Sequence, residues 1–146
     1  MPQYSHTVQV AAAPHDVFAI VDDTSRTPDW LSRCTRLDKL DDGPNQVGTP
    51  LRYYYRDGRR TGEMAGDIAV REPDRRLALR FVDKMMDVTV DFVTAPGDAP
   101  GSTSLTHTID ITTKGIGKIF TPMIKRGLPK QTIDAMEKLK ALAERG

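Results

Sequence analysis

The sequence predicts an α+β fold, in which a curved antiparallel sheet of about seven strands wraps around a long C-terminal helix. Two patterns support this prediction. Between residues 51 and 111, short segments with alternating apolar and polar side chains follow one another, separated by turn residues. After Lys114, apolar residues recur every three or four positions to the end of the chain, which is the period of a helix.

The first part of the chain combines one strand with two short helices. Residues 4–10 alternate loosely and are predicted to form the first strand. Pro14 suits the first turn of a helix, because the N–H that proline lacks would have no partner there. A second short helix is predicted over residues 27–31, with Pro28 near its first position. The expected order is therefore strand, two short helices, six strands and a long helix.

Five of the six later strands can be placed on the sequence. They are predicted at residues 51–55, 63–71, 77–82, 88–93 and 103–111. The links between them are short, which favours an antiparallel meander. Alternate side chains share a face, and the apolar sets, such as Met64, Gly66, Ile68 and Val70, are expected on one dry face of the sheet.

The C-terminal helix is predicted to begin at Ile116. Pro129 lies inside the helical pattern and removes one backbone hydrogen bond. The segment is therefore either one long helix or two pieces that meet near Gly127. Basic residues gather in its first half, and either a solvated helix face, which is favoured, or attraction to an acidic head group or a membrane surface explains them. These residues are Lys118, Lys125, Arg126 and Lys130.

Composition limits the classes of function. The 146 residues fit one domain spanning 1–146, and a net charge of +1 argues against nucleic-acid binding. The longest apolar run, Val17 to Val21, is too short to cross a membrane, and the N-terminus lacks the pattern of a signal peptide. Cys34 is the only cysteine and has no partner for an internal disulfide, so a cytoplasmic location is expected.

Several local motifs carry a resemblance to a known family over nearly the whole chain. They are Val8 to Phe18, Asp29-Trp30, Val47-Gly48-Thr49, Glu72 to Leu77, Gly101 to His107 and Leu139 to Glu144. In this order they resemble the START/Bet v 1-like superfamily, also called SRPBCC or helix-grip, and within it the bacterial polyketide cyclase/dehydrase-like members. The resemblance implies a ligand cavity between the sheet and the C-terminal helix. It implies no fixed catalytic signature.

The apolar inner faces and the front of the last helix are expected to line this cavity. The ligand would be a small hydrophobic or aromatic molecule, lipid- or polyketide-like. A register error of one residue would exchange the inner and outer sets. The expected lining residues are Tyr53, Tyr55, Met64, Ile68, Leu79, Phe81, Val90, Phe92, Leu105, His107, Ile109, Phe120, Met123, Ile124 and Gly127.

Few residues suggest chemistry. His107 lies between apolar residues of the last strand and could orient a carbonyl or act as an acid or base, although a core histidine bonded to a neighbour is the favoured interpretation. Trp30 is expected to pack the short helices against the sheet, and Cys34 to be a buried thiol. No metal-binding motif is present, and no cofactor is expected.

Three hypotheses of function follow. The first is a binding or carrier domain for a small hydrophobic molecule. The second is a cofactor-independent cyclase, aromatase or dehydratase that uses His107 and a tyrosine, so whether the protein is an enzyme stays open. The third is an interaction module that uses the helix or a sheet edge. The partners expected are a small molecule and, at most, a second copy of the chain, so that the protein is a monomer or a homodimer.

Overall fold

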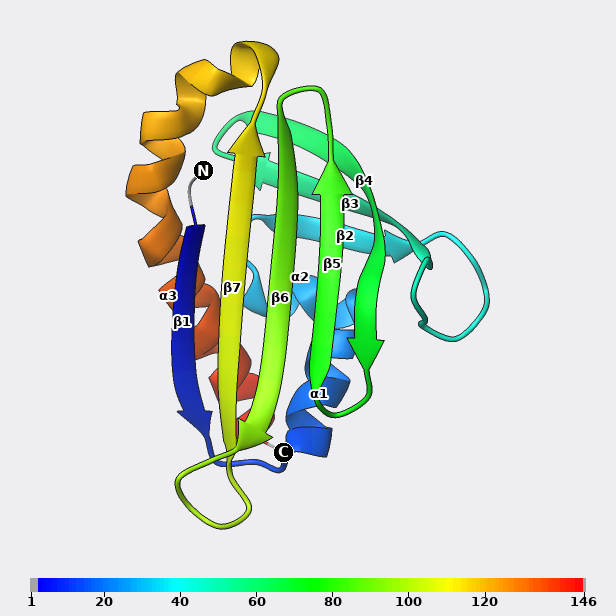
Figure 1. Ribbon diagram of the computed structural model, residues 1–146, viewed down its shortest axis with the longest axis vertical. Helices are drawn as coiled ribbons and strands as arrows, with labels where there is room; N and C mark the ends of the chain where they lie inside the picture. The colour runs from blue at the N-terminus through cyan, green and yellow to red at the C-terminus, as the bar shows by residue number, and fades with distance from the viewer. Residues whose placement is uncertain (1–2, 146) are drawn as a thin grey trace.

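A computed structural model describes residues 3–145, and its strands form one antiparallel sheet in the order β1-β7-β6-β5-β4-β3-β2 (Figure 1). The strands are β1 Gln3–Val10, β2 Cys34–Lys39, β3 Pro50–Asp57, β4 Arg60–Glu72, β5 Arg76–Val82, β6 Met86–Pro96 and β7 Thr103–Thr113. The helices are α1 Pro14–Asp22, η1 Thr24–Arg26, α2 Thr27–Trp30, η2 Gly115–Phe120 and α3 Thr121–Glu144, of which η1 and η2 are 3₁₀ turns. The predicted helix-grip arrangement is confirmed.

Strands β1 and β2 are consecutive among the strands but lie at opposite edges of the sheet. The two short helices and η1 make this crossing, and α1 contacts β5 and β6 on the way. Helix α3 contacts β1, β7, α1 and α2, so the helices gather on one side of the sheet (Figure 1).

The core joins the sheet to these helices. Val10 of β1, Val17 of α1, Leu105 of β7 and Leu139 of α3 are each 0% exposed. Complete burial of such an aliphatic side chain contributes about 1.5–3 kcal/mol. This shared burial holds the C-terminal half of α3 against the sheet.

Strand β2 is the strand that could not be placed from the sequence. Its two buried residues, Cys34 and Leu37, are three positions apart, and the register with β3 shifts between Cys34 and Arg36. Such a bulge interrupts the two-residue alternation by which strands are recognised. The strand also lies at the sheet edge, where few side chains need to be buried.

A second irregularity corrects the predicted inner face of β4. The register with β5 shifts between Ile68 and Val70, so Val70 pairs with Ala78 and Arg71 pairs with Leu77. Paired residues point to the same side of a sheet. Arg71 therefore takes the inner side in place of Val70, because the extra residue in the bulge reverses the alternation.

Pro129 does not divide the C-terminal helix into two pieces. Helix α3 continues from Thr121 to Glu144 with Pro129 inside it, so there is one long helix. Helical structure begins at Gly115, one residue before the predicted start, but its first part, residues 115–120, is the 3₁₀ turn η2, and the α-helix itself begins at Thr121. Ile116 and Ile119 belong to this turn and are 76% and 74% exposed.

Candidate ligand-binding site on the inner face of the sheet

Hydrogen-bond register places one row of residues across the inner face of the sheet. His107 of β7 pairs with His6 of β1 on one side and with Phe92 of β6 on the other. Phe92 in turn pairs with Leu77 of β5. Three of these four residues, His107, Phe92 and Leu77, are at most 5% exposed. The row is therefore part of the buried core between the sheet and the helices.

His107 is held as a neutral, stacked side chain. Its ring lies on Phe92 with 4.3 Å between centroids and 8° between planes. Nδ1 is 3.3 Å from the carbonyl oxygen of Asp91, which can only accept, so Nδ1 carries the proton. Burial lowers the pKa of His107 to about 4, and the bond to Asp91 only partly opposes this shift. At neutral pH the ring is uncharged, and Nε2 is left as an acceptor.

The two inner tyrosines form an aromatic group beside this row. Tyr53 stacks on Tyr55 at 5.9 Å between centroids and lies 5.3 Å from the ring of Phe81. Both tyrosines are partly exposed, and burial raises the pKa of Tyr53, so its phenol stays protonated. Tyr54 points to the opposite face, where its ring lies under the guanidinium of Arg36. Tyr53 and Tyr55 therefore share the inner face, as predicted.

The interior also holds two groups that the sequence suggested were structural. Burial raises the pKa of Cys34 to about 12, so its thiol is not a nucleophile at neutral pH. Trp30 of α2 packs edge-on against Phe92 at 5.5 Å between centroids, as expected for a packing residue. Its indole N–H, however, is buried with no acceptor among the described residues. A buried donor without a partner is rare and suits a ligand oxygen.

Exposure along the inner face is uneven. In β6 the burial falls from Phe92, which is 4% exposed, to Val90 and Val88, which are both partly exposed. In β7, Leu105 and His107 are buried, Ile109 is partly exposed, and Ile111 beyond it is 8% exposed and buried again. Val90 and Ile109 pair with each other. These partly exposed apolar side chains lie on the inner side of the sheet.

Helix α3 is buried only in its C-terminal part. Every buried residue of α3 lies at or after Leu128. Residues 121–127 carry no buried side chain, and Met123 is 57% exposed. The amino-terminal part of α3 lies at the end of the sheet where β7 ends and β6 begins (Figure 1). Helix α3 is therefore packed closely into the core from Leu128 onward and only loosely before it.

The residues predicted to line a cavity divide into three groups by burial. The buried ones are Met64, Ile68, Leu79, Phe81, Phe92, Leu105 and His107. The partly exposed ones are Tyr53, Tyr55, Val90, Ile109, Phe120, Ile124 and Gly127. Met123 is exposed. The structure thus brings the sheet residues together on one face, while of the four expected at the front of the last helix only Met123 is largely exposed.

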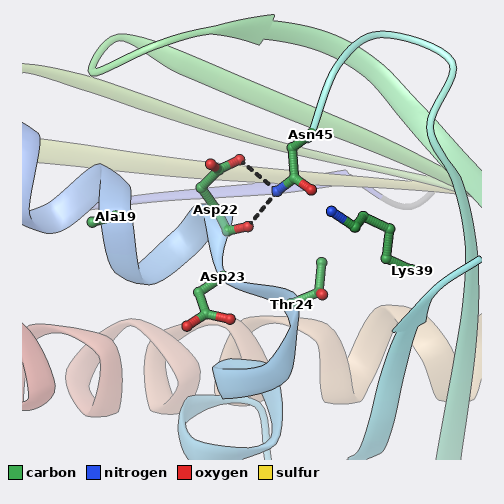
Figure 2. A pocket seen from close by; sticks show the side chains of 6 residues that line it. All are labelled: Ala19, Asp22, Asp23, Thr24, Lys39 and Asn45. Carbon is green, nitrogen blue, oxygen red and sulfur yellow. Dashed lines mark hydrogen bonds between the residues drawn. The ribbon is translucent and has the colours of Figure 1, made fainter. Parts of the chain in front are cut away.

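A polar pocket lies elsewhere, at the end of α1 (Figure 2). It has a volume of about 540 Å³ and is lined by Ala19, Asp22, Asp23, Thr24, Lys39 and Asn45. Its lining is mostly polar, so it does not suit a hydrophobic ligand. Asp23 caps η1 by accepting a hydrogen bond from the Ser25 N–H at 3.1 Å.

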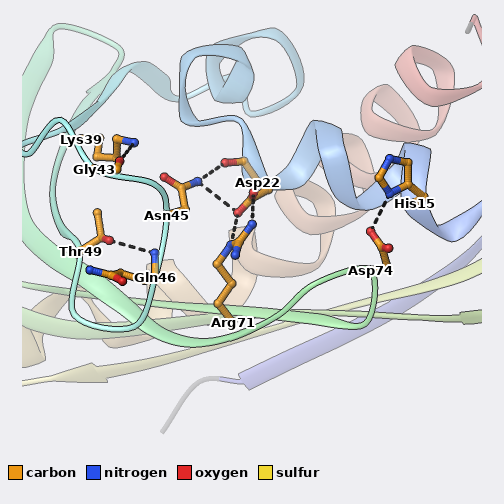
Figure 3. Close-up of polar contacts among 9 residues, drawn as sticks. All are labelled: His15, Asp22, Lys39, Gly43, Asn45, Gln46, Thr49, Arg71 and Asp74. Carbon is orange, nitrogen blue, oxygen red and sulfur yellow. Dashed lines mark hydrogen bonds and ion pairs between the residues drawn. The ribbon is translucent and has the colours of Figure 1, made fainter.

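The second carboxylate of this pocket is already engaged (Figure 3). Arg71 donates to Asp22 through Nε at 3.0 Å and Nη2 at 2.8 Å, and Asn45 Nδ2 donates to the Asp22 carbonyl at 2.7 Å. Burial would raise the pKa of Asp22, but the hydrogen bonds and charge of Arg71 outweigh it and lower the pKa. The network ties α1 to β4 and to the loop before β3. The sequence missed it because the β4 bulge decides where Arg71 points.

Metal clusters and membrane-spanning helices are absent from the described part of the chain. Within residues 3–145 no group of three metal-ligating side chains is close enough to hold a metal ion. No helix among these residues is both long and apolar enough to cross a bilayer.

Solved structures share this fold over nearly the whole chain. The Zhui aromatase/cyclase from Streptomyces sp. R1128 matches with a TM-score of 0.81 at 17% identity, covering 98% of this chain and 93% of that chain. A START superfamily protein from Mycobacterium smegmatis matches with a TM-score of 0.77 at 20% identity, covering 98% and 97%. The di-domain ARO/CYC StfQ from the steffimycin biosynthetic pathway matches at 0.79 and 14%, covering 99% of this chain and 51% of that one. At these identities the likeness establishes the fold alone.

The sheet, the helix packed against it and these structural relatives define a START/Bet v 1-like, or helix-grip, fold. The family model described as polyketide cyclase / dehydrase and lipid transport matches residues 1–144, and the chain belongs to this family. None of the curated proteins compared with the chain matches it. The family description covers both a reaction and a transport role, so the coarse assignment is ligand binding or cyclisation.

Proposed function

We propose that the protein binds a small hydrophobic or aromatic molecule between the inner face of the sheet and the amino-terminal half of α3. The observation that carries the proposal is the partial exposure of Val90, Ile109 and the two inner tyrosines on a face that is buried around His107, Phe92 and Leu77. Apolar surface left open to water inside a fold is stabilised when a ligand covers it.

The chemistry of the face suggests the kind of ligand. Its aliphatic part, from Val90 and Ile109, suits a chain or ring without charge. The stacked Tyr53 and Tyr55 offer a flat surface to an aromatic ring. The unpartnered indole N–H of Trp30 is a donor for a carbonyl or phenolic oxygen. Together these groups favour an oxygenated apolar molecule, such as a fatty acid, a lipid or an aromatic polyketide.

A variant that fills the space tests the proposal. Val90→Phe places a larger side chain on the inner face, and we expect the affinity for a bound fatty acid or aromatic polyketide to fall at least about tenfold, which corresponds to about 1.4 kcal/mol. Thr89→Phe is the matched control, because Thr89 is exposed on the outer face of the same strand. Native mass spectrometry and thermal-shift titration measure both variants. Equal affinity in Val90→Phe and the wild type, or no binding of any such ligand, would refute the proposal.

The second candidate function is cyclisation or dehydration of a ketone chain. It is favoured by the neutral ring of His107, whose Nε2 can accept a proton inside the apolar core. In this role His107 is the base, and the tyrosines bind the chain. Turnover of a poly-ketone substrate that disappears in His107→Phe while ligand binding persists supports this function. Binding without any turnover leaves the carrier function alone.

A further inference from the structure

The end of the fold that carries η2 has an unusual surface, here called the tip surface. It consists of the apolar residues Ile116, Ile119 and Met123 with the basic residues Lys118, Lys125 and Arg126. The three apolar side chains are 76%, 74% and 57% exposed. Exposed apolar residues scattered singly are ordinary, but three within eight positions of one turn and helix start form a patch.

The charge around this patch has one sign. Between residues 111 and 133 the sequence holds five basic residues and no acidic one. Within residues 3–145 no ion pair involves Lys118, Lys125 or Arg126. On the adjoining β5–β6 turn, Asp83 accepts hydrogen bonds from the N–H groups of Met85 and Met86, and at the start of β6 Asp87 pairs with Lys114 at 2.9 Å. The tip surface therefore offers several cations with no internal counter-charge.

A neighbouring hairpin extends the same charge. The guanidinium of Arg60, at the start of β4, lies 5.1 Å from the ring centroid of Phe120 in η2. This contact brings the β3–β4 turn, which carries Arg59 beside Arg60, against the tip surface. Figure 1 shows η2 at the extremity of the molecule, beyond the ends of the strands. The apolar residues thus stand at a projecting end with basic groups around them.

We infer that the tip surface docks on a lipid bilayer that contains anionic head groups. A projecting apolar turn can enter the boundary between head groups and acyl chains, and surrounding lysine and arginine side chains then meet the lipid phosphates. An acidic protein would satisfy the cations, but a bilayer accommodates both the cations and the largely exposed apolar side chains of Ile116 and Ile119. The inference does not depend on the ligand proposed above, because docking needs only the outer surface.

Vesicle binding tests the inference with the full chain. Flotation with vesicles of phosphatidylcholine and phosphatidylglycerol is expected to recover the wild-type protein, with much less recovered on pure phosphatidylcholine or at high salt. The triple variant Lys118→Gln, Lys125→Gln, Arg126→Gln should bind about a hundredfold more weakly, since each basic group near such a surface contributes about fivefold. Arg75→Gln with Arg145→Gln, in the β4–β5 turn and at the end of α3, is the control and should bind as the wild type does.

Two serine substitutions test the contribution of the apolar residues of the tip surface. Ile116→Ser with Ile119→Ser should weaken binding at least about tenfold, because both side chains would lose their burial in the interface. Leu40→Ser with Val47→Ser is the matched control, since these residues are 52% and 62% exposed outside the tip surface. Ile116→Trp should bind more tightly and show a blue-shifted emission on vesicles, because tryptophan prefers this interface.

The outcomes separate lipid from other partners. No binding to anionic vesicles, or equal binding by the serine pair and the wild type, overturns the inference. Binding to polyglutamate without binding to vesicles also overturns it, in favour of an acidic protein partner. All of the changed residues are exposed in the wild type, and circular dichroism confirms that each variant is folded. Failure of ligand binding in the Val90 experiment would leave these vesicle results unaffected.

Discussion

At the scale of single residues, the most informative side chain is His107. The sequence placed it on an inner face and favoured a core histidine, and its burial, stacking on Phe92 and contact with Asp91 agree with that interpretation. Its acceptor nitrogen keeps a chemical role possible in the proposed site. The unpartnered indole N–H of Trp30 could not be foreseen, because the pattern of a sequence does not show which buried donors lack acceptors.

The pKa of His107 predicts how stability depends on pH. Burial lowers this pKa to about 4 in the folded protein from 6.5 in the unfolded chain. Between these values the unfolded chain binds a proton that the folded protein does not, so the free energy of unfolding falls as pH drops from about 6.5 to about 4. The full effect of this one residue is about 3 kcal/mol.

Urea unfolding at a series of pH values measures this effect. The comparison is with His107→Gln, which keeps a polar side chain but does not titrate. The difference in free energy of unfolding between wild type and variant should shrink as the pH is lowered through that range. A constant difference would show that burial does not lower the pKa of His107 in the folded protein.

At the scale of elements, two β-bulges account for most of the structural features that the sequence pattern does not predict. Strands with regular alternation, such as β5 with buried Leu77, Leu79 and Phe81, could be placed with their inner faces. Strand β2 was not placed, because its bulge breaks the alternation. The bulge in β4 places Arg71 on the inner side of the sheet, where it contacts Asp22. A bulge depends on pairing with a distant strand, which local pattern does not encode.

The Asp22–Arg71 pair is predicted to join α1 to β4 energetically. Both side chains are mostly buried, at 18% and 25% exposed, and share two hydrogen bonds. Asp22→Ala and Arg71→Ala should each destabilise the fold by about 1–3 kcal/mol, since each leaves a partner unpaired. The double variant should lose less than the sum, with a coupling energy of about 1–2 kcal/mol.

A double-mutant cycle by urea unfolding at pH 7 measures the coupling. The exposed pair Arg52–Glu63, with an Nη1–Oε1 distance of 3.2 Å, is the control and should show coupling below about 1 kcal/mol. Below the lowered pKa of Asp22 the carboxylate is protonated, so its contribution is present at neutral pH and lost as the pH falls through that value. Purely additive effects at pH 7 would show that the pair does not connect the two elements.

At the scale of the whole molecule, the fold is tight where the C-terminal half of α3 meets β1 and loose where its first turns leave the sheet. Leu128, Met136 and Leu139 are at most 3% exposed, whereas no residue from 121 to 127 is buried. The sequence predicted one apolar stripe along the helix and could not show this division, because it depends on where the sheet ends. The proposed ligand space and the tip surface both lie at the loose end.

This division predicts the pattern of amide hydrogen exchange along one continuous helix. Amides of α3 before Leu128 should exchange faster than those after it, because local opening there exposes no buried side chain. A ligand between the sheet and the front of α3 should slow exchange in residues 121–127 and at Ile109, and leave residues 132–143 unchanged. Exchange read by mass spectrometry, with and without a bound fatty acid, measures both effects. Uniform protection along α3 without ligand would show that the front of the helix is held by contacts as strong as those of its C-terminal half.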